Sequence, residues 1–580
     1  MTEFEKRLIE YAQRGELLVC PASAPAVRAE LIRELLLGRH GELDPSGVQL
    51  QGARIKGAFD LDRVTASVSL YLHDCVIDEP IEARYAHLRA LTLHGGQCVG
   101  LQADGVHIDA DLYLEGGLQV EGSLKDGLIR LVGSHIEGDL SLNDVAFTNK
   151  AGSAFHAERI RIGGAVFMRK KIRITGHGED GAINLSSASI AGDLRLDDHV
   201  RLTNLTGPAL NADDIRIQGS AVLENGFRAV GHGEGSAVSL GNANVVLNIS
   251  LSDAEITNRS GCGFDVDSAR VGGSVFLGKD VKISGHGKNG AIDVAGARIG
   301  GNLELEAEVC NDLGPALNAN SVDVGESLFL HNGGRLTARD TTGAIDLISG
   351  HIAGALDFRD VVVTNSIGPA VCAEQVHVDG ELVLQDPTRL IGNGNSGAVA
   401  LSGARISRLN GWSEVDVQVK AGRGPVFDLQ EVVVGTSVTL PPALMCLNHE
   451  VRCSHRRQVR LDEFSYASLG PGWDWQQWLH LIRRHTPAYH ASAYQRLAAV
   501  ERAAGHDGTV RQILMAQQTD LRRRNPKALG GPLTQWFHWL WGALAGYGYR
   551  ARRTAGALLL VLAMAGFLGW AAGQVATRPG

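Results

Sequence analysis

A short glycine-led motif repeats along most of this chain and constrains the fold more than any other feature. The motif is Gly-x-Φ-x-Φ, where Φ is an apolar residue. It reads GAFDL at Gly57, GDLSL at Gly138, GDLRL at Gly192, GNLEL at Gly301 and GELVL at Gly380. From Gly57 to Gly380 the copies fit twelve intervals of about 27 residues, if one worn copy lies near Arg84. A last copy, TSVTL at Thr436, is expected to close the series.

A second motif precedes these copies by about eleven residues and occurs in two alternating types. GA-type copies, such as GAINL at Gly181 and GAIDV at Gly290, alternate with GP-type copies, such as GPALNA at Gly207 and Gly314. Successive GA-type copies lie 53 to 55 residues apart. The full repeating unit is therefore expected to be a double coil.

Apolar and polar residues alternate with period two inside each unit, which predicts short β-strands with one buried face. A unit of this length is too short for a propeller blade and too rich in strands for a leucine-rich repeat. We predict a mainly β fold, a parallel β-helix (solenoid) of about 14 coils over residues 43–445. Stacking at about 4.8 Å per coil gives a rod roughly 65–70 Å long. We expect the glycines to serve turns with positive φ or close backbone approach.

The two ends of the chain have helical patterns. FEKRLIEYAQRG and PAVRAELIRELLLGRH predict an N-terminal helical cap over residues 1–42, with an independent regulatory helix pair as the alternative. GWDWQQWLHLIRRH, SAYQRLAAVERAAG and DGTVRQILMAQQTDLRRR predict three helices in a domain at 446–530. That domain is either a helical hairpin of the tetratricopeptide kind or a C-terminal cap, and both interpretations stay open.

The C-terminus predicts a membrane anchor. Residues 554–577 carry no charge and are long enough for one transmembrane helix, so we assign 551–580 to that helix and a short tail. Arg550, Arg552 and Arg553 precede it, and Trp570 lies near its far end as an interfacial anchor. The positive-inside rule places the arginines and the bulk of the chain in the cytoplasm.

The preceding segment, residues 531–550, is an aromatic stretch with Trp536, Trp539 and Trp541. As a second span it would put one of its flanking arginine clusters outside the cell. An interfacial helix avoids that conflict and suits the aromatic content, so we favour it and keep the second span as the alternative.

Charge is distributed unevenly. The chain carries a net −9, whereas residues 450–553 hold 16 basic and 7 acidic residues. An acidic body argues against nucleic acid as a partner, and a basic C-terminal end fits an anionic lipid bilayer. The polar N-terminus shows no secretory signal, and eight scattered cysteines form no disulfide framework. We expect a single-pass protein of the bacterial inner (cytoplasmic) membrane.

Glycine-rich GxGxxG segments occur at Gly176, Gly285 and Gly392. A dinucleotide site requires a helix directly after such a segment, and here a short β pattern follows. We interpret the segments as solenoid turns. His177, His232 and His286 recur two coils apart, about 10 Å at the stacking distance, which is too far to share one metal ion.

Two other groups of residues suggest chemistry. Cys446, His449, Cys453 and His455 have ligand types that suit zinc, although their spacing matches no standard module. Asp60, Asp139, Asp193 and Asp357 lie near repeat glycines and could mimic the carboxylates of a polysaccharide lyase. We favour a solvated strand face for these aspartates, and we assign no catalytic or cofactor-binding residue.

Several segments together resemble a bacterial β-helix-repeat family labelled "membrane-associated oxidoreductase" or left as uncharacterised membrane proteins. They are VRAELIRELLLG, GVQLQGARIKGAFDL, the GAIxL coils, AYQRLAAVERAAGHDGTVRQILMAQQ, and GYGYR before the last helix. The label implies redox activity, but no cofactor fingerprint supports it, and we expect no cofactor. We therefore expect a non-catalytic scaffold that binds a protein partner or itself. The alternative is a membrane-associated enzyme, redox or carbohydrate-active.

Overall fold

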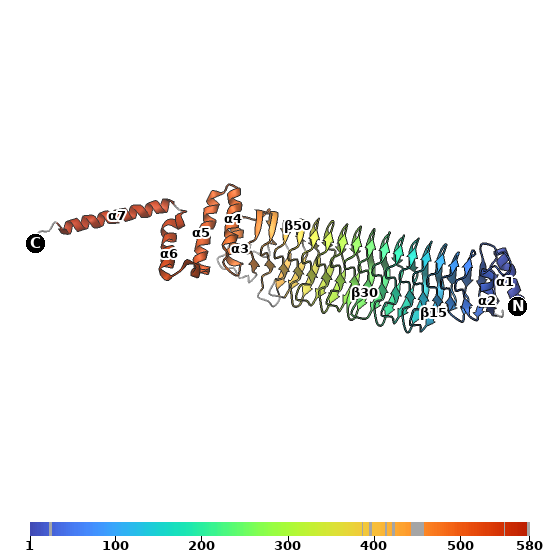
Figure 1. Cartoon of the computed structure of the whole chain (residues 1–580). Coiled ribbons are helices and arrows are strands. Elements are labelled where there is room, and N and C mark those ends of the chain that lie inside the picture. The colour runs from blue at the N-terminus through green and yellow to red at the C-terminus, as the bar shows by residue number, and fades with distance from the viewer. Residues whose placement is uncertain are drawn as a thin grey trace.

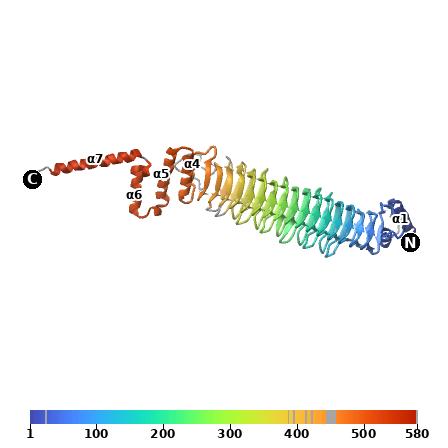
Figure 2. The ribbon, with the colours of Figure 1, turned by 45° about the horizontal axis from the view of Figure 1, so that its top comes forward.

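The computed structural model is a long rod of stacked β-strands with helices at both ends (Figure 1). It describes residues 1–21, 26–385, 387–393, 397–411, 415–419, 424–441, 458–549 and 551–576. Within these residues two parallel sheets run along the rod, one of 42 strands and one of 16. The turned view in Figure 2 shows the same unbroken stack, with the C-terminal helices extending from one end. The predicted parallel β-solenoid is confirmed.

Each strand of the smaller sheet marks one turn of the solenoid. The strands are β5 (Phe59–Asp60), β9 (Ile81–Glu82), β13 (Leu101–Gln102), β16 (Ile129–Arg130), β19 (Phe155–His156), β23 (Ile183–Asn184), β27 (Leu210–Asn211), β30 (Ser236–Ser239), β33 (Cys262–Asp265), β37 (Ile292–Asp293), β41 (Leu317–Asn318), β45 (Ile345–Asp346), β49 (Val371–Cys372), β52 (Val399–Ala400), β55 (Phe427–Asp428) and β57 (Val459–Arg460). Sixteen strands enclose fifteen intervals, so the described stack has about fifteen turns.

The larger sheet supplies the other sides of each turn. In one typical turn, β31 (Asn244–Val245) leads into β32 (Ile249–Asn258), and β33 follows. Inward-facing residues such as Ile249, Leu251 and Ile256 are fully buried. One apolar cluster continues from the N-terminal helices through the solenoid into the C-terminal block. A single turn leaves its apolar edge open above and below, so the stack as a whole makes the core.

Turn length differs between the N-terminal end and the rest of the rod. Leu50, Leu72, Leu93 and Leu114 are successive register partners only 21 or 22 residues apart, whereas Leu114 and its next partner Leu142 are 28 apart. The expected 27-residue interval with a worn copy near Arg84 is therefore wrong for this end. Short turns replace the worn copy at this end. Over the predicted span of 43–445 the strands β5 to β55 still enclose fourteen intervals, and the fifteenth lies beyond it, at β57.

GAFDL at Gly57 belongs to a different motif from the one expected. Phe59 lies in β5 of the smaller sheet, as Ile183 of GAINL does, whereas Leu140 of GDLSL lies in β18 (Leu140–Asn149) of the larger sheet. At the other end, β58 (Ser465–Leu469) pairs with β56 (Val433–Thr439). The strands thus continue beyond the copy at Thr436.

Close approach explains the glycines of the Gly-x-Φ-x-Φ copies from Gly138 onward, whereas the GA-type glycines Gly181 (φ 122°) and Gly290 (φ 118°) have positive φ. A Cβ on Gly164 would lie 2.1 Å from Oδ1 of Asp139 on the preceding turn. The left-handed position of each turn is instead filled mostly by other residues, for example Ser187 (φ 57°), Asp214 (φ 58°) and Asn242 (φ 55°). Both reasons expected for the glycines therefore apply, at different positions of the repeat.

The alternation of GA-type and GP-type turns has its own structural basis. In GP-type and related turns a buried asparagine donates from Nδ2 to two carbonyl oxygens: Asn258 donates to Gly235 O at 2.7 Å and Cys262 O at 2.9 Å. Asn149, Asn204, Asn311 and Asn365 do the same. On GA-type turns the register partner is glycine or alanine, as Gly231 is for Asn258. A Cβ there would lie 2.7 Å from Ala237 Cα.

The N-terminal helices cover the first turns. Helix α1 (Glu3–Arg14) begins at a capping box formed by Thr2 and Glu5 and ends at Gly15 in the left-handed conformation. Strands β1 (Leu18–Val19) and β2 (Val27–Arg28) pair with the first full turn, and α2 (Ala29–Leu36) follows. The buried residues of both helices belong to the common core.

Three helices form a block against the last turn, and they match the three predicted segments. They are α3 (Trp475–Arg484), α4 (Ala491–Ala503) and α5 (Asp507–Arg524). Trp478 of α3 packs edge-on against Tyr466 of β58, at 5.3 Å between ring centroids. Arg496 of α4 donates to Tyr466 O at 2.7 Å. The block therefore covers the apolar end of the solenoid, as a cap does.

Candidate functional site

The last two helices expose most of their apolar surface. Helix α6 (Pro532–Ala545) and helix α7 (Ala551–Ala576) follow a short 3-10 turn, η2 (Pro526–Leu529). Residues Ala555–Gln574 of α7 are long and apolar enough to cross a membrane, and none of this segment is buried. At 1.5 Å per residue these 20 residues span about 30 Å, the thickness of a bilayer's hydrocarbon core.

The predicted anchor tryptophans lie on these helices with their rings uncovered. Trp536 is 57% exposed, Trp539 48%, Trp541 50% and Trp570 63%. Arg550 and the side chains of Arg552 and Arg553 lie outside the described part of the chain. The four tryptophans of the predicted anchor are therefore exposed on α6 and α7, and their role as an anchor stays a prediction.

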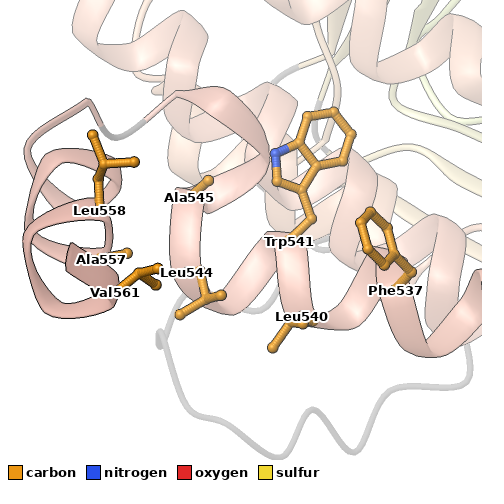
Figure 3. A pocket seen from close by; sticks show the side chains of 8 residues that line it. All are labelled: Phe537, Leu540, Trp541, Leu544, Ala545, Ala557, Leu558 and Val561. Atoms are coloured by element: carbon orange, nitrogen blue, oxygen red, sulfur yellow. The ribbon is translucent and has the colours of Figure 1, made fainter. Parts of the chain in front are cut away.

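An apolar cleft of about 560 Å³ lies between α6 and α7 (Figure 3). Side chains from both helices line it: Phe537, Leu540, Trp541, Leu544, Ala545, Ala557, Leu558 and Val561. No charged side chain is among these lining residues. Exposed apolar surfaces of this kind mark sites that bind a membrane, another protein or a ligand.

Helix α6 is joined to the helical block by polar and aromatic contacts. His538 Nε2 lies 3.1 Å from Gln518 Oε1 of α5, and its ring packs against the ring of Tyr547, tilted by 39°, at 4.8 Å between centroids. Burial lowers the pKa of His538, and the positive charge of Arg522 adds to this. One side of α6 therefore faces the block, while Trp536 and Phe537 stay exposed.

The helical block has a buried ionic centre at Asp520. This carboxylate accepts from Arg483 Nε at 2.8 Å, from Arg483 Nη2 at 3.2 Å and from the Tyr494 hydroxyl at 2.8 Å. The carboxylate raises the pKa of Arg483. Arg524 donates to the carbonyl oxygens of Ile482, Thr486 and Ala488 at the end of α3. These contacts fix α5 against α3 and α4.

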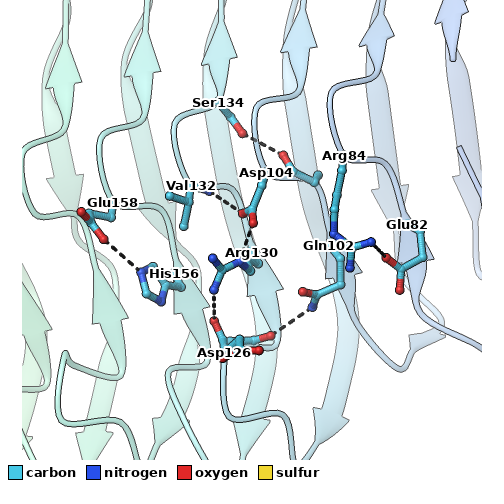
Figure 4. Close-up of polar contacts among 12 residues, drawn as sticks. Glu82, Arg84, Gln102, Asp104, Asp126, Arg130, Val132, Ser134, His156 and Glu158 are labelled. Carbon is cyan, nitrogen blue, oxygen red and sulfur yellow. Dashed lines mark hydrogen bonds and ion pairs between the residues drawn. The ribbon is translucent and has the colours of Figure 1, made fainter. Parts of the chain in front are cut away.

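A polar column runs along the outer face of the smaller sheet (Figure 4). Near its N-terminal end, Arg130 Nε donates to Asp104 Oδ2 at 2.6 Å and Gln102 Nε2 donates to Gly127 O at 3.0 Å. Farther along, the column holds Asn or Asp on most turns. Each accepts the backbone N–H two residues later, as Asn184 does from Ser186 and Asp265 does from Asp267. This turn geometry explains why the fourth residue of GAINL and GAIDV is Asn or Asp.

Two carboxyl groups follow one another in this column. Asp265 and Asp293 are register partners on successive turns and line a polar pocket of about 380 Å³. Asp265 accepts from the Ser236 hydroxyl at 2.9 Å, and Asp293 accepts from Asn318 Nδ2 at 3.0 Å. Burial raises the pKa of Asp265 to about 7 and that of Asp293 to about 6, and the charge of Asp267 adds to both shifts. Such groups exchange protons near neutral pH, as general acids and bases must.

The four aspartates singled out from the sequence occupy different positions in the coil. Asp139 Oδ1 accepts the backbone N–H of Ala165 on the next turn at 2.7 Å, and Asp193 accepts that of Ser220 at 2.8 Å. Asp60 pairs with Arg33 of α2 at 2.9 Å. Asp357, 5% exposed, lies 2.8 Å from Arg359. They therefore form no common site; Asp139 and Asp193 join successive turns.

The GxGxxG segments at Gly176 and Gly285 are turns between strands, whereas the segment at Gly392 lies partly outside the described residues. The segment at Gly176 connects β22 (Arg173–Gly176) to β23, and no helix follows it. His177 Nδ1 lies 2.9 Å from Asn149 O, and His286 Nδ1 lies 3.4 Å from Asp312. Among the described residues, neither these histidines nor His232 takes part in a group of three metal-ligand atoms.

The predicted zinc ligands Cys446, His449, Cys453 and His455 lie outside the described residues. The six cysteines that are described carry free thiols. Burial raises the pKa of Cys75 and of Cys98 to about 11, so these thiols stay protonated and unreactive at neutral pH.

Two arrangements were not predicted from the sequence. The only sequence pattern that points to the Asp265–Asp293 pair is the repeated Asp in FDV and IDV. A column of histidines at His87, His107 and His135 could have been found in the sequence, because His-Ile or His-Leu recurs at each of these positions.

Comparison with known proteins gave no match: no protein-family model, no curated protein and no solved structure matches this chain.

Proposed function

We propose that this chain is a membrane-anchored β-solenoid scaffold of the bacterial inner membrane. Helix α7 spans the bilayer once, and α6 lies in the interface with Trp536, Trp539 and Trp541 at headgroup depth. The solenoid extends into the cytoplasm, where its faces bind a protein partner or a second copy of the chain.

The observation that carries this proposal is the exposed apolar surface of α6 and α7 at one end of the rod. Leu558, Leu562 and Phe567 of α7 are each at least 60% exposed. In water this surface costs about 25 cal/mol for every Å² of apolar area, whereas a bilayer covers it.

The length of α6 and the charge of the neighbouring block support the interfacial placement. At 14 residues α6 is about 21 Å long, shorter than the hydrocarbon core. The last turn of α5 carries Arg522, Arg523 and Arg524, which favour the anionic cytoplasmic leaflet. With these arginines inside, α7 alone crosses.

The scaffold role is supported by how the solenoid uses its polar side chains. Asn258 and its equivalents, the Asx-turn residues and Asp139 all bond to backbone groups of their own or adjacent turns. They hold the rod rigid, and the turns repeat about every 4.8 Å along its axis. A stiff, periodic surface suits a long partner or side-by-side pairing.

One observation favours the alternative, a membrane-associated enzyme. Asp265 and Asp293 titrate near neutral pH beside a polar pocket of about 380 Å³. Acid–base chemistry on a polar substrate such as a carbohydrate would use this site.

Membrane fractionation tests the anchor. A chain ending at Gly530 loses α6 and α7, which bury little against the block, and it should move from the membrane to the soluble fraction. Leu562→Arg, in the middle of the candidate span, should lower the membrane fraction several-fold, because a charge at the bilayer centre costs about 2.5–3.5 kcal/mol. Leu562→Ala is the matched control. A truncated chain that stays with membranes contradicts the anchor.

Native mass spectrometry of the full chain, released gently from membranes, tests the scaffold. A mass equal to a multiple of the bare chain, or to the chain plus another protein, supports it. Added mass of a flavin, a nicotinamide nucleotide or a bound substrate fragment supports the enzyme and overturns the scaffold.

A further inference from the structure

A column of histidines lies on the outer face of the larger sheet near its N-terminal end. Three short strands stack in register there: β10 (His87–Leu88), β14 (His107–Ile108) and β17 (His135–Ile136). Leu88, Ile108 and Ile136 are buried in the core, so period-two alternation turns each histidine outward. The solenoid thereby fixes three imidazoles at one-turn intervals.

The three rings stand close together. Ring centroids lie 4.6 Å apart between His87 and His107 and 5.0 Å apart between His107 and His135, with the planes nearly perpendicular. All three side chains are partly exposed, between 36% and 46%. Solvent and small ions therefore reach the column.

Two carboxylates, each two residues after a histidine, lie between the rings. Asp109 Oδ1 is 2.6 Å from His87 Nε2 and 3.2 Å from His107 Nε2. Glu137 Oε1 is 3.8 Å from His107 Nε2 and 3.4 Å from His135 Nε2. Each carboxylate thus meets the Nε2 atoms of two successive turns.

These atoms form two overlapping groups of three ligands. One is His87, His107 and Asp109, the other is His107, His135 and Glu137, and in each group all three atoms lie within 4.8 Å of one another. Ligands about 2.1 Å from one ion are separated by about 3–4 Å, so small side-chain rotations complete either site. Two imidazoles and a carboxylate suit Zn²⁺ and neighbouring transition metals.

A second histidine column, at His351 and His377, does not bring three ligand atoms together. There His351 Nδ1 lies 2.9 Å from Asp323, while its Nε2 lies 3.1 Å from Asp379. His377 Nε2 lies 2.9 Å from the other oxygen of Asp379, so the two histidines use different oxygens of this carboxylate, and their ring centroids are 5.7 Å apart. Among the described residues only the two groups at His107 bring three such atoms together.

We propose that this column binds one transition-metal ion of the Zn²⁺ class. His87, His107 and Asp109 are the ligands, and His107, His135 and Glu137 form the alternative site. Because both groups use Nε2 of His107, one chain holds one ion at a time, and water fills the remaining coordination positions. This inference is independent of the scaffold proposal.

The test is titration of the full-length protein, in detergent and stripped with a chelator, with Co²⁺ and with Zn²⁺. The segment with Cys446 and Cys453 could also bind metal, so Cys446→Ser/Cys453→Ser is the working background. The absorption of Co²⁺ in a nitrogen and oxygen site lacks a thiolate charge-transfer band. We expect one ion per chain in this background and a Co²⁺ spectrum of that kind.

His107→Asn removes the shared ligand and should weaken binding at least 100-fold. His87→Asn leaves the alternative group and should weaken it about tenfold, while His351→Asn, the matched control in the second column, should leave it unchanged. Thermal melting checks that each variant keeps its fold. Binding that survives in His107→Asn, that is lost equally in His351→Asn, or that is absent in the unsubstituted column overturns the proposal.

Discussion

Asp265 shows how one polar position of the repeat takes on different properties on different turns. It makes the same local turn as Asn184, yet it adjoins a second carboxylate at Asp293 and lies in a pocket. Its raised pKa means that the folded protein holds a proton that the unfolded chain releases between about pH 4 and pH 7. The free energy of unfolding therefore falls as pH rises through this window.

Asp265→Asn should flatten this dependence. The amide keeps the oxygen that accepts the Asp267 N–H, and no charge has to be buried at neutral pH. We expect the variant to be more stable than the parent at pH 8, by about 1.4 kcal/mol for each unit by which the pKa is raised on folding, and no more stable at pH 4. Urea unfolding at both pH values measures this. Asp280→Asn, at an exposed turn, is the control, and equal gains at both pH values would contradict the assignment.

For single residues, the sequence can predict the position of the asparagines that join alternate turns, but it cannot predict their hydrogen bonds. Asn149, Asn204, Asn258, Asn311 and Asn365 recur every 53 to 55 residues, so a search of the sequence for this spacing finds them. Their buried bonds to carbonyl groups cannot be found that way, because Asn in a turn usually faces solvent. Likewise, nothing in the sequence shows that Asp265 is half-buried whereas Asp60 pairs with an arginine of the N-terminal cap.

Among the elements, the helices were the most predictable and the first turns the least. The spacing of Trp478, Leu481 and Ile482 predicts α3, and the uncharged run predicts α7. The short first turns were misplaced because one interval was imposed on the whole series. In fact β9 and β11 (Leu91–His94) belong to turns that omit several loop residues, and a fixed period cannot detect this.

The contact that orders the helical block is the Asp520 carboxylate. Asp520→Ala would leave the Arg483 guanidinium and the Tyr494 hydroxyl without their acceptor, so we expect a loss of about 3 kcal/mol. The fluorescence of Trp478, buried between the block and the last turn, reports this unfolding step in urea. Gln512→Ala, on the exposed side of the same helix, should change little. Equal midpoints for the two variants would show that the ionic contact does not stabilise the block.

For the whole molecule, the alternation of turn types predicts which shortened rods can fold. Removing residues 259–311 joins Asn258 to Asp312 and keeps the order of asparagine and glycine turns. Removing only residues 259–285 joins Asn258 to His286, and it places a side chain where Gly285 now stands, 2.8 Å from Ala291 Cα for the added Cβ. We expect the larger deletion to keep a cooperative thermal transition and the smaller one to lower its midpoint by several degrees. A smaller deletion that melts at the higher temperature would contradict this.

The pairing of turns also limits how such a rod can change in evolution. Where asparagine and glycine turns alternate, from Asn149 to Asn365, the pattern is kept only when the gene gains or loses a two-turn cassette in tandem. Each cassette changes the reach of the molecule by about 10 Å. Chains built on this plan would therefore differ in length by whole multiples of one cassette. The distance from the N-terminal cap to the helical block would then be inherited as the number of cassettes that the gene encodes.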